Sequence, residues 1–421
     1  TDVASTAYAL QVLLNARDLD LVDDQPVART RAALAAAQAA GGDVRGGPRV
    51  AAFVVRTLAA AAGKAPDDAL RRAIAALKAS ARDTGDPYVL ASYALAAVET
   101  GAGDEAQWAL ERLGALAVLD GDRASWRLDG ETPFHAWGRT GDVETTALAV
   151  EALTRAARAG VTVDRGAEAA VEGLRFLISS KDRHGVWHST RTTVAVLDAL
   201  TAAGTMTDER RQVEVFVDGV RVASVETTGR SGPLFVPLGQ VAPGSHRVEV
   251  RGGEGALLAA QFVASYYAPW SSESLSVDGR AARTVNGLRL AVAYDRTRTD
   301  VGAPVTCTVD VSRAAGAGML LAEVGLPPGA DVDRESLERA RTTLGTVVDA
   351  YEVHPDRVVV YLSPGLVPTR FAFSFRLRYA VSALAAPSSV YDYYNPDASV
   401  TLAPPRFTVG SQESGVRSQS L

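Results

Sequence analysis

Residues 184–200, HGVWHSTRTTVAVLDAL, begin as a glycine-centred turn with a tryptophan and continue as an alanine-rich amphipathic helix. Residues 134–153, FHAWGRTGDVETTALAVEAL, have the same order of turn, tryptophan, threonine pair and apolar residues at helical spacing. Apolar residues at i, i+3, i+4 and i+7 place one apolar stripe along a helix. The chain therefore uses the same helix entrance at least twice.

The same theme occurs in two further stretches. DVASTAYALQVLLNA (2–16) and DPYVLASYALAAVET (86–100) also have a short polar start followed by an Ala/Leu/Val stripe. Repetition of this kind is typical of stacked or circularised helix pairs, in which no pair can bury its apolar face alone. We expect the threonine pairs 145–146 and 192–193 to lie in the first turn of their helices, where hydroxyls can bond orphan N–H groups. The repeated phrase is thus interpreted as architecture.

The chain reads as helices as far as residue 204. Turns rich in Gly, Pro and Asp, such as GKAPDD and DTGDP, separate the helical stretches. The expected helices lie near residues 2–17, 25–40, 48–62, 66–81, 86–100, 103–117, 142–159, 165–180 and 189–204.

After residue 210 the apolar period becomes two, which indicates strands. QVEVFVDGVRVASVE (212–226) alternates around Asp218-Gly219, a pair that favours a two-residue hairpin. One helix is expected over residues 333–353, with Asp333 as its N-cap. Further strands are expected at 246–251, 257–267, 286–295, 304–312, 318–325, 357–362, 370–380 and 388–394.

Two joints divide the chain, GTMTDERR (204–211) and the Ser/Gly-rich WSSESLSVDGRAA (270–282). The segment between them has few strands, and isolated hairpins are marginal, so we expect it to borrow strands from sequence upstream of residue 1. The chain also starts without Met and inside a helical pattern, which favours a fragment of a larger protein. The expected domains are 1–207 for the helices, 208–283 for the β segment, 284–408 for a β-sandwich with one helix, and 409–421 for a disordered tail.

Composition excludes several classes of function. The 421 residues are 47% hydrophobic and 22% charged, as in globular domains with substantial cores. The net charge of −6 gives no basic footprint for nucleic acid. No apolar run reaches the ~18–20 residues that span a bilayer. The single cysteine, Cys307, rules out an intrachain disulfide, a cysteine-rich metal site and a Cys-x-x-Cys redox pair.

The helical phrases resemble the thioester domain of the alpha-2-macroglobulin family, of the bacterial type. GVWHSTRTTVAVLDAL is similar to the last helix entrance of that domain, DVETTALAVEAL to the preceding copy, and TDVASTAYALQVLL to an earlier one. The downstream order is also similar, since the sandwich closes on the aromatic phrase SSVYDYYNPD (388–397). The resemblance covers residues 1–408. It implies an N-terminally truncated α/α toroid, then a CUB-like β segment, then a receptor-binding, macroglobulin-like β-sandwich.

The chemistry of that family rests on a Cys-Gly-Glu-Gln thioester, which this sequence lacks. The resemblance places the thioester upstream of Thr1 and implies no catalytic residue, metal or cofactor in this chain. Cys307 lies on an alternating strand and is expected to be a small core residue. Vertebrate members carry two lysines for receptor docking, and the corresponding positions here are Arg334 and Glu338. That receptor docking is therefore not implied.

The resemblance implies a broad-range endopeptidase inhibitor and not an enzyme. In that family a protease cuts an upstream bait region, the β-domains rearrange, and the thioester domain swings out to trap the protease. The implied partners are target proteases and the missing N-terminal macroglobulin-like domains, with membrane anchoring only through that missing part. The implied location is extracellular or periplasmic. We expect the aromatic end of the sandwich, Tyr391, Tyr393 and Tyr394, to contact the helical domain and shield the thioester.

Two histidine motifs are candidate sites. His184 and His188 are four residues apart, a spacing that would suit zinc on a helix, but Gly185 predicts a surface turn instead. His135 beside Trp137 would suit a pocket, and we expect a packed aromatic corner there.

Other functions stay open as alternatives. Terpene cyclases and prenyltransferases are also double rings of helices with tryptophan turns similar to DRHGVW, but the Asp-x-Asp-Asp acid and a ring cysteine are missing here. The acidic pairs 23–24 and 67–68 are explained as helix starts, where carboxylates favour the helix dipole. The turns of Trp126, Trp137 and Trp187 are interpreted as framework. A non-inhibitory adhesion or scaffold module is the third class.

Overall fold

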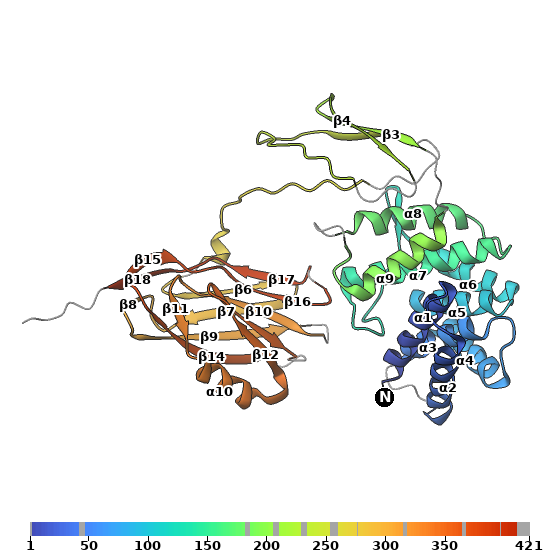
Figure 1. Cartoon of the computed structure of the whole chain (residues 1–421), viewed down its shortest axis with the longest axis horizontal. Coiled ribbons are helices and arrows are strands. Elements are labelled where there is room, and N and C mark those ends of the chain that lie inside the picture. The colour runs from blue at the N-terminus through green and yellow to red at the C-terminus, as the bar shows by residue number, and fades with distance from the viewer. Residues whose placement is uncertain are drawn as a thin grey trace, which may run out of the picture. The chain divides into compact units, whose positions relative to one another are not determined.

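The chain forms two compact units, one of Thr1–Arg127 and Asp142–Ala264 and the other of Leu128–Gly141 and Ser265–Leu421 (Figure 1). Among the described residues no helix combines the length and apolarity needed to cross a membrane. The computed structural model describes residues 2–41, 47–181, 186–204, 210–228, 234–252, 260–275, 277–314, 318–363, 368–395 and 397–410.

The first unit begins with helices that confirm the expected ones, although α7 starts four residues earlier than the predicted residue 142. A short hairpin of β1 (Val118–Asp120) and β2 (Arg123–Ser125), which the sequence did not predict, lies between α6 and α7. The helices are α1 (Val3–Asp18), α2 (Asp24–Gly41), α3 (Gly47–Ala62), α4 (Asp68–Thr84), α5 (Pro87–Glu99), α6 (Gly103–Ala115), α7 (Gly138–Arg158), α8 (Gly166–Ser179) and α9 (Thr190–Ala203).

Polar caps decide where several helices begin. Asp86 Oδ1 accepts the backbone N–H groups of Tyr88 and Val89 at 2.9 and 3.1 Å, and Pro87 occupies the first helical position of α5. Ser189 Oγ accepts the N–H of Thr192 at 3.1 Å at the start of α9. These bonds satisfy N–H groups that a helix leaves without an intrahelical partner.

The threonine pairs differ in their position along the helix. The pair 192–193 lies in the first turn of α9, as predicted. The pair 145–146 lies about two turns inside α7, because this helix begins at Gly138, so the first-turn prediction is wrong for that copy.

α5 is the most deeply buried helix of this group. Every residue from Tyr88 to Ala97 is buried, and α5 packs against α3, α4 and α6. A helix that is apolar on all sides needs neighbours on all sides. The central place of α5 follows from its sequence, PYVLASYALAAVE.

The β segment of the first unit is a three-stranded sheet with the order β4-β3-β5, formed by β3 (Arg211–Val217), β4 (Val220–Thr227) and β5 (Val248–Gly252). The predicted hairpin is confirmed, and its turn residues Asp218 and Gly219 have φ of 51° and 81°. The predicted strand over 257–267 is wrong for residues 260–267, which form no strand, and its residues 257–259 lie outside the described part of the chain.

The second unit is built on two five-stranded sheets with the orders β12-β13-β10-β16-β17 and β11-β14-β9-β7-β6, beside a small sheet β15-β18-β8. β6 pairs with β7 along its whole length, so the sandwich includes residues before the expected boundary at 284. The strands are β6 (Arg280–Val285), β7 (Leu288–Tyr294), β8 (Arg298–Asp300), β9 (Pro304–Arg313), β10 (Leu320–Gly325), β11 (Ala330–Val332), β12 (Val348–Val353), β13 (Arg357–Leu362), β14 (Thr369–Leu377), β15 (Val381–Leu384), β16 (Ser388–Asp392), β17 (Ser399–Leu402) and β18 (Arg406–Gly410).

The helix of the sandwich is shorter than predicted. Asp333 caps it as expected, accepting the N–H groups of Glu335 and Ser336. The helix α10 (Arg334–Leu344) then stops at Gly345, which has a φ of 56°. The last part of the predicted helix is instead the strand β12, because the positive φ of a glycine ends a helix.

Cys307 lies in the core of this sandwich, as predicted. It is fully buried, shares the inner face of β9 with Val305 and Val309, and packs in the cluster formed by both sheets. Burial raises the pKa of its thiol well above the ordinary value, which makes it an inert apolar side chain. The prediction of a disordered tail, 409–421, is wrong for residues 409 and 410, which belong to β18, and the tail from 411 onward lies outside the described residues.

Candidate functional site

Trp126 ties two helices of the first unit together. Its indole Nε1 donates to the carbonyl of Leu113 near the end of α6 at 2.7 Å, and its backbone N–H donates to Thr146 Oγ1 of α7 at 3.0 Å. The side chain is fully buried.

Trp187 repeats this arrangement one helix pair later. Its indole Nε1 donates to Leu177 O of α8 at 2.6 Å, and its backbone N–H donates to Thr193 Oγ1 of α9 at 3.3 Å. The repeated tryptophan and the second threonine of each pair thus form one bonding unit. For Trp126 and Trp187 the framework interpretation is confirmed.

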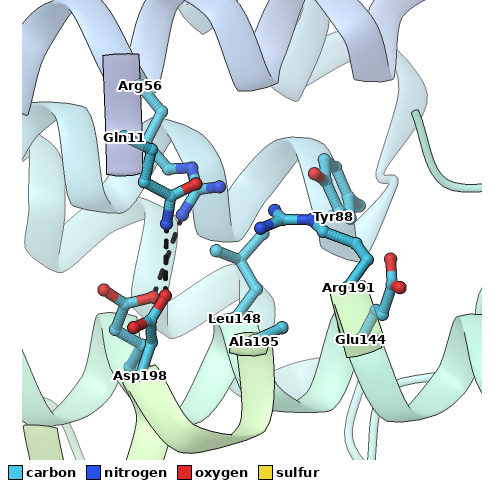
Figure 2. Close-up of a pocket in the computed structure, with 9 residues that line it drawn as sticks. Gln11, Arg56, Tyr88, Glu144, Leu148, Arg191, Ala195 and Asp198 are labelled. Carbon is cyan, nitrogen blue, oxygen red and sulfur yellow. Dashed lines mark hydrogen bonds and ion pairs between the residues drawn. The ribbon is translucent and has the colours of Figure 1, made fainter. Parts of the chain in front are cut away.

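The repeated phrases also bring chemically active side chains together. The four phrases can be aligned on their first residues, which are Asp2, Asp86, Asp142 and Ser189. Eight of the residues that line one cavity then lie two, six or nine places after these starts. The ninth, Arg56, occupies the equivalent place nine residues after Gly47, so α3 is a fifth copy that the sequence did not reveal. We call this space, which lies among α1, α3, α5, α7 and α9, the axial cavity. It is lined by Gln11, Arg56, Tyr88, Glu144, Leu148, Glu151, Arg191, Ala195 and Asp198 (Figure 2).

Equivalent positions of different copies interact at one end of the axial cavity. Gln11 Nε2 donates to Asp198 Oδ2 at 3.2 Å, and Arg56 Nη1 lies 3.8 Å from Glu151 Oε2 (Figure 2). All four residues are the ninth after the start of their phrase. Glu151 also pairs with Arg155 Nη2 at 2.9 Å, so its buried charge is compensated.

At the other end the interactions involve Glu144 and Arg191, each two residues after the start of its phrase. Thr192 Oγ1 donates to Glu144 Oε1 at 2.8 Å, which joins α9 to α7. The guanidinium of Arg191 lies 4.8 Å from the ring centre of Tyr8 and 5.2 Å from that of Phe53. These are cation–π distances, so both rings attract the guanidinium of Arg191.

Asp198 is an acid of the cavity with a clearly shifted pKa. Burial raises its pKa from 3.8 to about 6, and the nearby charge of Glu151 adds to this shift. The arginines 191, 56 and 155 act in the opposite direction. A carboxylate near a second carboxylate in a partly dry site holds its proton more tightly.

The axial cavity itself is small, about 10 Å³. That is room for about one water molecule. Among the described residues, Arg56 Nε and Gln11 Oε1 are buried there without a hydrogen-bond partner. Buried polar atoms of this kind are commonly satisfied by ordered water. The arrangement balances charge and joins helices, and it has no space for an organic substrate.

The aromatic end of the sandwich is organised by a buried ion pair. Arg313 Nη1 lies 3.1 Å from Asp392 Oδ2, with side chains 3% and 1% exposed. Asp392 Oδ1 accepts the N–H groups of Tyr394 and Asn395 at 2.9 and 3.0 Å, which fixes the turn. Burial raises the pKa of Asp392, and the charge of Arg313 opposes this shift.

This turn displays part of the predicted tyrosine set. The rings of Tyr393 and Tyr394 are edge to face with centres 5.3 Å apart, and Tyr393 is 44% exposed. Tyr391 lies on β16 opposite Leu321 of β10. The structure thus brings the three tyrosines to one end of the second unit, and their contact with the helical domain stays a prediction.

The histidine predictions have mixed outcomes. His135 is exposed and bonded to Glu131 at 3.0 Å, and its ring centre lies 6.4 Å from that of Tyr394, so the predicted corner is aromatic but is not buried. Trp137 packs against the sandwich core within the second unit. His188 has a φ of 53°, as expected for a turn. His184 and Gly185 lie outside the described residues. Among the residues that the structure describes, no group of three metal-ligating side chains occurs.

The axial cavity was missed by the sequence reasoning, although a signal was present. In DVETTALAVE and STRTTVAVLD a charged residue precedes the threonine pair and an acid follows seven places later. Two such positions on one face of each of these helices predict a shared polar line. The threonine pair and the apolar stripe are the stronger patterns in these phrases, and the charged residues stand among them as single positions.

Comparison with known proteins agrees with these features. The model of the A-macroglobulin TED domain matches residues 1–202, and that of the A-macroglobulin receptor binding domain matches residues 315–403. No curated protein matches the chain in sequence.

Several solved structures are similar to the chain. The crystal structure of native alpha-2-macroglobulin from Escherichia coli, spanning domain MG7 to the C-terminus, is 12% identical with a TM-score of 0.57, and the match covers 97% of this chain and 63% of that one. The cryo-EM structure of the native conformation of the E. coli protein is 12% identical with a TM-score of 0.57, and the match covers 97% of this chain and 25% of that one. The crystal structure of Salmonella alpha-2-macroglobulin reacted with methylamine is 14% identical with a TM-score of 0.54, and the match covers 97% of this chain and 26% of that one.

At these identities the structural likeness shows the fold, and this chain spans less than two thirds of each of these relatives. The family models carry the assignment further, since together they match most of the chain in the order of thioester domain and then receptor-binding domain. The chain belongs to the alpha-2-macroglobulin family and corresponds to the C-terminal part of its members.

Proposed function

We propose that this chain is the C-terminal part of a broad-range endopeptidase inhibitor that traps proteases after cleavage of a bait region. The observation that carries the proposal is the order of the two family matches, residues 1–202 and then 315–403, within a fold shared over 97% of the chain with bacterial alpha-2-macroglobulin. In this proposal the helical ring is the part that moves, and the thioester lies outside the sequence given.

The β segment is proposed to be one part of a CUB-like domain, within residues 208–283. Its sheet has one buried row, Val213 and Val215, whereas β4 is largely exposed. Large aromatic side chains within the same residue range are also uncovered, with Phe235, Tyr266 and Tyr267 exposed by 90%, 85% and 105%. Exposure on this scale supports the proposal that further strands of the whole protein cover this segment.

The size of the axial cavity argues against an enzyme of the terpene cyclase or prenyltransferase type. Such enzymes hold an organic substrate inside the ring, and ligand pockets have volumes of about 300–1,000 Å³. The axial cavity measures about 10 Å³ and is filled by charged side chains that bind each other. The ring is therefore proposed to be a structural body that carries reactive chemistry at its surface.

Tyr391, Tyr393 and Tyr394 are proposed to shield the thioester before activation. Their support is the fixed turn at Asp392, which presents the partly exposed ring of Tyr393. The proposed partners are target proteases and the N-terminal macroglobulin-like domains, and the proposed location is extracellular or periplasmic.

The test uses the full-length native protein. Its intact mass is measured before and after methylamine treatment, together with its free thiols, and it is then incubated with endopeptidases of different specificity. A mass short by one ammonia, restored with amine uptake and release of a thiol, would establish a thioester, and denaturation-resistant adducts with several proteases would establish trapping. A plain mass with non-covalent inhibition would leave a thioester-free trap, and no effect on any protease would favour a scaffold.

A further inference from the structure

A groove separates the helix of the sandwich from the outer face of the sheet beneath it. The groove has a volume of about 340 Å³, in the range of sites that hold small ligands or peptide side chains. We call it the α10 groove. It is lined by Thr306, Ser336, Arg339, Ala340, Thr343, Leu344, Arg370, Phe371, Ala372, Phe373 and Ser374.

The two walls of the groove follow from secondary structure. On β14 the exposed positions Arg370 and Ala372 alternate with the buried Phe371 and Phe373. On α10 the lining positions include Ser336, Arg339 and Thr343, which recur at helical spacing. One wall is therefore a helix face and the other is a pleated sheet, each carrying one arginine.

Neither arginine has a hydrogen-bonded acid within the described residues. Arg339 approaches Asp333 only to 3.6 Å and Glu335 to 3.9 Å, and Arg370 approaches Asp310 to 3.7 Å. Their side chains are 67% and 72% exposed. Ion pairs this loose and exposed contribute little, so both guanidinium groups are free to take another partner.

The rest of the lining suits an extended segment with acidic side chains. Among the residues that the structure describes, no carboxylate lines the α10 groove, although Asp333, Glu335 and Asp310 lie 3.6–3.9 Å from its two arginines. Ala340, Leu344 and Ala372 give a low apolar floor. The hydroxyl groups of Thr343 and Ser336 donate hydrogen bonds to the backbone carbonyls of Arg339 and Asp333. The two arginines are therefore the main donors available to a ligand.

We propose that the α10 groove binds an acidic segment of a partner protein, with one carboxylate on Arg339 and a second on Arg370. A guanidinium group offers two parallel N–H donors to a carboxylate, which gives such a pair both strength and direction. β14 lies inside its sheet between β11 and β9, so the segment binds through side chains and adds no strand.

This site is separate from the family's receptor positions and from the proposed protease trap. Arg334 and Glu338, which take the places of the vertebrate receptor lysines, do not line the groove. Glu338 is instead bonded to Arg341 at 3.0 Å and to Tyr351 at 2.9 Å. The proposal rests on the sandwich alone and holds whether or not the whole protein carries a thioester.

The test measures binding of a fluorescein-labelled octaglutamate peptide to the 421-residue chain by anisotropy at low salt. We expect saturable binding that weakens at least about fivefold in Arg339→Gln and in Arg370→Gln. Arg334→Gln is the matched control, on the same helix but outside the groove, and should change the affinity less than twofold. Asp310→Asn should tighten binding, because it removes the acid that competes for Arg370.

Several outcomes would overturn the proposal. Absence of saturable binding would do so, and so would an equal loss in the control variant, which would indicate diffuse electrostatics. Equal binding of an octalysine peptide would show that charge does not select the ligand. Circular dichroism of each variant separates loss of binding from loss of fold.

Discussion

Gln11 and Asp198 join α1 to α9 through a hydrogen bond of 3.2 Å between residues 187 positions apart in sequence. Both residues occupy the same place in their copies of the repeated phrase. The bond therefore shows that the copies are in register along the axial cavity, and it places a perturbed acid where the ring is held together.

Asp198→Asn should stabilise the chain at neutral pH. The folded-state pKa of Asp198, about 6, lies above its ordinary value of 3.8, so the folded state binds this proton more tightly than the unfolded state does. That contribution is fully present below about pH 4 and is lost as the pH rises through 6. We expect the free energy of unfolding to rise by about 1–3 kcal/mol at pH 7.5 and to change little at pH 4.

Urea titrations at both pH values, followed by circular dichroism, measure this difference. Asp164→Asn, at an exposed position of the same unit, is the control and should be neutral at both. An equal effect of Asp198→Asn at pH 4 and pH 7.5 would contradict the assignment of the shifted pKa.

Trp187→Ala should cost about 3–5 kcal/mol of unfolding free energy, because it removes a buried ring and the bond to Leu177 O. Trp187→Phe should cost less, since the ring volume is mostly kept. Trp270→Ala is the control, because that side chain is 47% exposed and should change stability by about 0.5 kcal/mol or less. A Trp187→Ala loss as small as the control's would show that the ring is not packed.

The thiol of Cys307 should be unreactive in the native chain. It is fully buried, and burial raises its pKa, so the thiolate that reacts is scarce and inaccessible. Labelling with a thiol-specific disulfide reagent at pH 8 should be complete in urea and slow without it. Because this is the chain's single cysteine, rapid native labelling would directly show an open sandwich core.

Arg313→Met should destabilise the second unit by about 3–5 kcal/mol, since it leaves the carboxylate of Asp392 buried without its counter-charge. Adding Asp392→Asn to this variant should recover part of the loss. The comparison of the single and double variants by thermal unfolding isolates the charge from the packing. A double variant less stable than the single one would point to the turn bonds of Asp392 as the larger contribution.

Tyr393→Ala combined with Tyr394→Ala should make the full-length protein react faster with small amines, if these rings shield the thioester. Tyr379→Ala is a control in the same unit, with a side chain 67% exposed. The rate of methylamine incorporation, followed by mass, measures the effect. An unchanged rate would sink the shielding proposal.

The helices could be predicted from the sequence because their information is local. Caps such as Asp86 and Asp333, and stripes at helical spacing, act within a few residues and were confirmed. The strands on either side of long loops were harder. β8, β11 and β18 are short and depend on distant partners, which local patterns do not contain.

The error at residues 345–353 arises locally, at a glycine that ends the helix and begins the approach to a hairpin. Leu344 and Val347 continue the helical spacing, but Gly345 adopts a positive φ and Val348 pairs with Leu362 of β13. Strand pairing overrides the helical stripe at this point. The axial cavity was missed for a different reason, because its residues are scattered over five helices and only the repeat relates them.

The register of the repeated helices has a consequence for how the chain tolerates change. Each copy keeps the residues by which it packs on its neighbours, whereas the residues that face the axis need only suit one another as a set. A substitution at Gln11 or Arg56 therefore changes the environment of Asp198 or Glu151, far away in sequence. Substitutions of the residues that line the axial cavity should be epistatic. The loss of stability from each one should depend on the residue at the equivalent position of another copy.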